Sequence, residues 1–160
     1  MSTCHEWINS AVALAGLVLG AVSMINSNRT SRRYASGNVP IVNKSLDPAR
    51  LEKAADVLSS IFREAGGIPA DADIGACRLS VQNKEGYAEL CDVFHDLNNV
   101  CAIIQDDALP PKVKKTAKSL VNDYLSRAQV LCFAKMFEEK YASLQPFVNE
   151  VERNWGNRKH

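Results

Sequence analysis

The amino-terminal part of the chain holds an unbroken apolar run from Trp7 to Ile25, which reads WINSAVALAGLVLGAVSMI and contains no charged residue. A helix over this run would be roughly 28 Å long, close to the hydrocarbon thickness of a bilayer. A core helix of a small soluble domain would carry a polar stripe at helical spacing, which Ala11 to Val22 lacks. A signal peptide would begin with Lys or Arg, and neither occurs in MSTCHE. The pattern therefore predicts a transmembrane helix.

The two sides of this run differ in charge. Arg29, Arg32 and Arg33 follow it, whereas His5 is the one basic side chain before it. By the positive-inside rule, the amino terminus lies outside and the remainder of the chain in the cytoplasm, so we expect the protein in the inner (cytoplasmic) membrane. The three arginines would lie among the lipid head groups, where anionic lipid attracts each of them by about 1 kcal/mol. Membrane lipid is thus the first expected partner.

Gly16 and Gly20 form a GxxxG pair within the apolar run. Small residues at this spacing let two transmembrane helices approach closely, which would favour homodimerisation. Glycine is also common in transmembrane helices in general, so the pair alone does not distinguish a packing face from ordinary composition.

The segment after the apolar run is polar and basic, and it contains Gly37 and Pro40. We expect these two residues to break the helix as the chain leaves the membrane. The pattern divides the chain into an anchor over residues 1–27, a basic juxtamembrane linker over 28–44 and a cytoplasmic α-helical domain over 45–160.

From residue 45 onward, apolar residues recur at intervals of three and four, the spacing of amphipathic helices. The first helix begins after a cap at Ser45 or Asp47, with Pro48 at its first position. Residues 77–82 fit either a helix or an extended piece. We expect an all-α domain, built as a small antiparallel helical bundle, with helices over about 48–65, 84–105, 111–127 and 130–146 and a last one ending near Trp155.

Composition narrows the classes of function. The sequence is 46% apolar and 23% charged, which is typical of a globular domain rather than a disordered tail. Its net charge of +1 argues against a polyanion-binding protein, which would show a strong basic excess, so nucleic acid is not an expected partner. The five cysteines have no regular short spacing, which favours free thiols in a reducing compartment over a disulfide framework.

Cys91, His95 and Cys101 are the candidate metal ligands, because thiolates and imidazole at such short separations are groups that zinc prefers. A fourth ligand is not apparent. Cys91 and Cys101 also fall on the apolar face of a predicted helix, where free cysteine behaves as a small hydrophobic residue. The sequence therefore predicts no metal site, no cofactor and no catalytic residue.

Three segments carry a resemblance to a known family: SNRTSRRYA after the apolar run, VFHDLNNVCAIIQDDAL, and the closing YASLQPFVNEVERNWGN. They are similar to an uncharacterised bacterial and phage family, a domain of unknown function, whose members combine an amino-terminal transmembrane helix, basic residues after it and a compact helical domain. The chain departs from that family at Pro110 and Pro111 and in the lysines that follow. The resemblance implies a topology and no catalytic residue.

Together these observations favour a non-enzymatic, single-pass membrane-anchored interaction module, for which the resemblance suggests a phage or prophage origin. Its helical domain would bind a protein partner or form a homo-oligomer. Two alternatives stay open. One is a membrane-tethered helical effector enzyme, nuclease-like, that uses His95 or His160. The other is a lysis-type protein whose amino-terminal helix acts on the membrane through Gly16 and Gly20.

Overall fold

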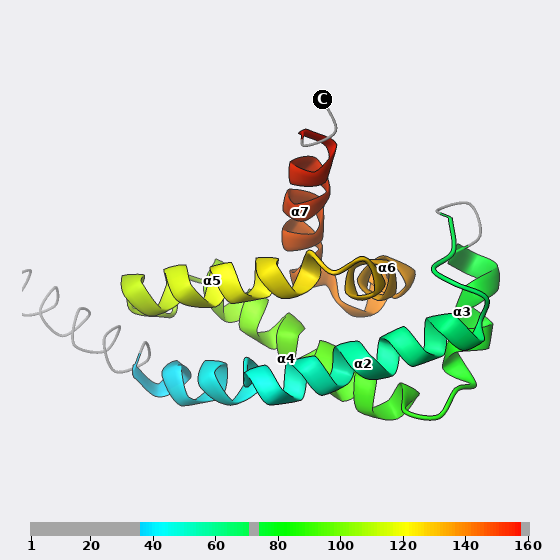
Figure 1. The fold of residues 1–160 in the computed structure, drawn as a ribbon. Coiled ribbons are helices and arrows are strands. Elements are labelled where there is room, and N and C mark those ends of the chain that lie inside the picture. The colour runs from blue at the N-terminus through cyan, green and yellow to red at the C-terminus, as the bar shows by residue number, and fades with distance from the viewer. Residues whose placement is uncertain (1–35, 71–73, 158–160) are drawn as a thin grey trace, which may run out of the picture.

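The computed structural model describes residues 36–70 and 74–157, and in these ranges all regular structure is helical. The all-α class and the helical bundle are thereby confirmed (Figure 1). A helical segment over residues 36–45 comes first. It is followed by α2 (Pro48–Glu64), α3 (Ile74–Gln82), α4 (Tyr87–Gln105), α5 (Pro111–Leu125), α6 (Ala128–Met136), the 3₁₀ turns η2 (Glu138–Lys140) and η3 (Ala142–Leu144), and α7 (Gln145–Asn157).

The helical segment over residues 36–45 corrects one expectation, because the chain does not break at Gly37 and Pro40. Val42 and Leu46 are 2% and 5% exposed, so burial of their side chains supports a helix through two residues of low helix propensity. Asn38 Nδ2 also donates to the Ala108 carbonyl at 3.1 Å, which ties the start of the segment to the loop before α5. The described end of the predicted linker is therefore part of the packed helical structure.

The predicted membrane helix from Trp7 to Ile25 lies outside the described residues. Among the helices that are described, none is both long enough and apolar enough to cross a bilayer.

Helix α2 follows the expectation from its sequence. Pro48 is its first residue, and the Asp47 side chain accepts a hydrogen bond from the Ala49 amide at 3.4 Å. The helix ends before Gly66 and Gly67, whose φ angles of +94° and +118° are unfavourable for any residue with a Cβ atom. One face of α2 is buried, through Leu51, Ala54, Ala55, Leu58, Ile61 and Phe62.

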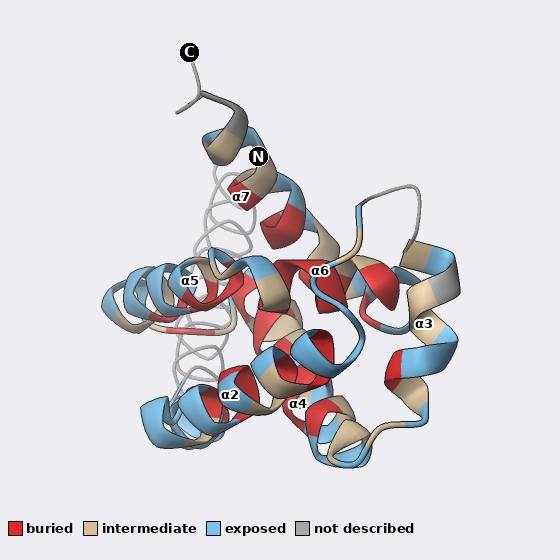
Figure 2. Ribbon diagram, turned by 45° about the vertical axis from the view of Figure 1, so that its right-hand side comes forward, coloured by how far each residue is buried: buried red, intermediate tan, exposed pale blue. Residues whose placement is uncertain are grey.

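A cluster of aromatic rings fills the centre of the bundle. Phe94 of α4 lies against Phe133 of α6, with ring centroids 4.5 Å apart. Phe137 continues the cluster from Phe133 at 4.8 Å, and Tyr141 contacts Phe94 at 5.7 Å. The ring planes are tilted by between 39° and 48°, a geometry in which aromatic pairs attract each other. Around this centre the buried faces of the helices turn inward (Figure 2).

The apolar series after Val130 predicts one continuous helix up to Pro146, and the structure corrects this. Helix α6 ends at Met136, and two 3₁₀ turns separate it from α7. The Asn98 side chain of α4 stabilises this break, because its Oδ1 accepts from the backbone amides of Ser143 at 2.9 Å and Leu144 at 3.2 Å. The turns carry Tyr141 into the aromatic cluster. Helix α7 then rises across the direction of α2 and α5 (Figure 1).

Candidate functional site

One hollow on the surface contains two of the three candidate metal ligands. Cys91, Asp92 and His95 of α4 line it together with Lys140 and Tyr141 from the turns after α6, around a volume of about 390 Å³. Cys91 and His95 lie one helical turn apart and therefore share a face of α4. The opposite wall is formed by Lys140 and Tyr141. The hydrogen bonds between Asn98 and the backbone of η3 hold this wall in place.

The polar groups of this hollow differ in exposure. Tyr141 is 3% exposed, and burial raises the pKa of its phenol; its hydrogen bond with Cys91 acts in the same direction. Lys140 Nζ donates to Tyr87 Oη at 3.1 Å and lies over the Tyr87 and Phe137 rings, at 5.7 and 5.4 Å from their centroids. The hollow thus presents a half-buried thiol and an exposed imidazole, which can form hydrogen bonds to a small polar ligand.

Cys101, the third candidate ligand, lies apart from this hollow. Its side chain is fully buried among the core residues, and burial raises the pKa of the thiol to about 12. Over residues 36–70 and 74–157, no three His, Cys, Asp or Glu side chains are grouped as a metal site would require. Cys101 therefore acts as a small core residue, as its place on the apolar face indicates.

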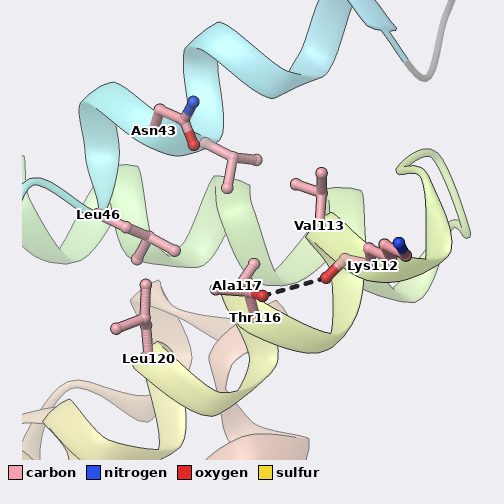
Figure 3. Close-up of a pocket in the computed structure, with 8 residues that line it drawn as sticks. Asn43, Leu46, Lys112, Val113, Thr116, Ala117 and Leu120 are labelled. Atoms are coloured by element: carbon pink, nitrogen blue, oxygen red, sulfur yellow. Dashed lines mark hydrogen bonds between the residues drawn. The ribbon is translucent and has the colours of Figure 1, made fainter.

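A second hollow lies between residues 36–45 and the first half of α5. It encloses about 230 Å³, and Figure 3 shows the side chains of both elements pointing into it. Most of its lining is apolar. The lining residues are Val42, Asn43, Leu46, Lys112, Val113, Thr116, Ala117 and Leu120.

The lysines of α5 differ in their ion pairs. Lys114 Nζ lies 2.6 Å from Asp107 Oδ1, and Lys118 Nζ lies 2.9 Å from Glu150 Oε2. Lys112 and Lys115 are exposed, and neither forms an ion pair with any part of the chain that the structure describes. Positive charge without a carboxylate partner therefore collects at the start of α5, beside the second hollow.

A third hollow, of about 280 Å³, is formed by the loop after α2 together with α3, α6 and α7. Trp155 of α7 lines it with Ile68 and Ile74, and Ile68 is 47% exposed. At its rim, Lys135 Nζ lies 2.8 Å from Glu152 Oε1. Of the elements that form it, α3 and the loop after α2 lie at the end of the bundle opposite to residue 36, and α7 rises from the middle (Figure 1).

The other site residues singled out from the sequence lie outside the described residues: Gly16, Gly20, Arg29, Arg32, Arg33 and His160. Comparisons with family models, with curated proteins and with solved structures gave no match to this chain. The similarity to an uncharacterised bacterial and phage family stays a prediction.

The difference between Cys91 and Cys101 can be measured by thiol labelling. In the folded full-length chain at pH 8, we expect iodoacetamide to modify Cys91 and to leave Cys101 unmodified, because Cys101 is fully buried and its pKa of about 12 keeps it protonated. Raising the pH toward 10 increases the thiolate fraction of an ordinary thiol but leaves Cys101 in its neutral form. Peptide mass spectrometry with and without denaturant measures both sites. Labelling of Cys101 at a rate equal to that of Cys91 in the folded chain would contradict the assignment.

Proposed function

We propose that this protein is a single-pass, membrane-anchored interaction module that holds its helical domain at the cytoplasmic face of the membrane, where the domain binds a protein partner. The apolar run from Trp7 to Ile25 supports the anchor. Only residues 26–35 separate that run from the first described residue, and ten residues span at most about 36 Å. The end of the bundle that bears residue 36 would therefore stay close to the bilayer.

The observation that carries the binding role is the third hollow, the one formed around Trp155. Two of its walls, α3 and the loop after α2, lie at the end of the bundle opposite to residue 36, so an anchored domain would hold them away from the bilayer. Trp155, Ile68 and Ile74 supply a tryptophan with aliphatic neighbours, and the Lys135–Glu152 ion pair forms a polar rim. Buried aromatic anchors inside a polar rim are typical of the parts of an interface that contribute most to binding.

The anchor is tested by membrane fractionation of the full-length chain. We expect the protein in the membrane pellet after carbonate washing and its release by detergent. Leu17→Arg together with Val18→Arg should move most of it to the soluble fraction, since each arginine at the centre of a membrane helix costs about 2.5–3.5 kcal/mol of insertion free energy. Leu17→Ile with Val18→Leu is the matched control and should stay in the pellet. A wild-type chain that is soluble without detergent would refute the anchor.

The binding surface is tested by photocrosslinking from inside the third hollow. A benzophenone amino acid at position 155 of the full-length chain should give a discrete adduct in cells, and the same group at Ser119, exposed on α5, should not. Ile68→Asp should abolish the adduct, because it places a charge in the apolar hollow. Leu79→Asp is the control, since Leu79 is 68% exposed but does not line the hollow.

The mass of the adduct then identifies the partner class. An adduct at twice the mass of the chain would indicate self-association, and another defined mass would indicate a different protein. Equal crosslinking from positions 155 and 119, or an adduct that survives Ile68→Asp, would contradict the proposal.

A further inference from the structure

The second hollow, between residues 36–45 and α5, has a defined direction. The hydrogen bond from Asn38 to the Ala108 carbonyl joins the starts of the two elements, so they run side by side away from residue 36. Lys112 and Val113 lie at the near end, and Leu46 and Leu120 lie at the far end (Figure 3). The eight steps from Lys112 to Leu120 rise by about 12 Å along α5. The hollow is therefore an elongated groove.

The size of the groove limits what can occupy it. Its volume of about 230 Å³ exceeds that of the ~150 Å³ protein cavity that binds benzene, but it is below the range of roughly 300–1,000 Å³ for drug-sized ligands. A partner helix is ~10 Å across with its side chains, so a ~12 Å length of it would occupy roughly 900 Å³, far more than the groove holds. The volume and the ~12 Å length together suit a segment of a single extended hydrocarbon chain.

The apolar lining is continuous along the groove. Val42, Leu46 and Ala117 are almost fully buried and form the floor. Val113 is half-buried, and Leu120 remains 39% exposed, one of few large apolar side chains so exposed in the described part of the chain. An apolar occupant would remove this surface from water.

The charge of the groove is confined to one end. Lys112 lines the near end, and Lys115 follows it by one turn of α5. Within the described residues these two ammonium groups have no carboxylate partner, whereas Lys114 and Lys118 are paired with Asp107 and Glu150. An apolar channel with unpaired cations at one end complements an amphiphile that has a hydrocarbon tail and an anionic head.

We infer that this groove binds an acyl chain of an anionic membrane phospholipid, with Lys112 and Lys115 on the phosphate of its head group. The shape and charge of the groove follow from the described residues. The membrane as the source of the lipid rests on the proposed anchor. The lysine end is also the end that bears residue 36, so an anchored domain would hold it near the head groups.

The test uses the full-length chain, labelled at its methyl groups, in nanodiscs of phosphatidylcholine with phosphatidylglycerol. A doxyl spin label near the end of the phosphatidylglycerol acyl chain should broaden the methyl resonances of Leu46 and Leu120 and spare those of Leu79 on α3. Thr116→Trp fills the groove from an exposed position and should remove the broadening. Ser119→Trp, on the same helix but outside the lining, is the matched control and should keep it.

The head group is tested by charge. Lys112→Gln and Lys115→Gln should each weaken occupancy about fivefold, while Arg153→Gln on α7 should not change it. Equal broadening by labelled phosphatidylcholine would overturn the anionic preference. Broadening from a head-group label alone would show that the domain only rests on the surface, and it would overturn the acyl site.

Failure of the anchor and failure of the groove give different results. A chain that enters the nanodiscs but shows no broadening at Leu46 and Leu120 overturns the groove and leaves the anchor intact. A chain that does not enter the discs refutes the anchor. In that case doxyl-labelled stearate, added to the soluble chain, tests the same two leucines: broadening supports the acyl groove, and its absence overturns it.

Discussion

The contact between Phe94 and Phe133 is the interaction on which the rest of the described structure depends. Their ring centroids are 4.5 Å apart, and both side chains are fully buried. Phe94 belongs to α4, which packs against α2, α5 and η3, and Phe133 belongs to α6, which packs against α2, α3 and α7. The pair thus joins the two helices that between them contact every other helix from α2 to α7. Each such aromatic contact contributes about 0.5–1.5 kcal/mol beyond its buried area.

Two of the three hollows are lined by elements that carry the aromatic centre. The Cys91–His95 hollow takes its opposite wall from the turn that carries Tyr141, whose ring contacts Phe94. The hollow at Trp155 uses α6, on which Phe133 lies. None of these aromatic rings lines the groove beside α5. The groove beside residues 36–45 and the hollow at Trp155 are thus formed by different elements of the bundle.

The sequence predicted the structure best for features that depend on a single helix. The cap at Asp47, the proline at position 48 and the burial of Cys101 follow from local rules of capping and periodicity. The same local rules failed where contacts between distant parts of the chain determine whether a segment is helical. The segment through Gly37 and Pro40 is helical because Val42 is buried against the bundle, and the turn before α7 depends on Asn98, which lies 45 residues before Ser143. The hollows could not be predicted, because each combines segments remote in sequence, such as Ile68 with Trp155.

The central role of the Phe94–Phe133 contact is tested most directly by native-state amide hydrogen exchange of the full-length chain, comparing wild type with Phe133→Leu. Phe→Ala in a core costs about 3–5 kcal/mol, and Phe133→Leu should cost less, so the variant remains folded. If the contact joins the elements into one cooperative unit, protection should fall by the same free energy in α4, in α6 and in residues 36–45. Loss of protection confined to α6, with wild-type values in α4 and in residues 36–45, would contradict the account.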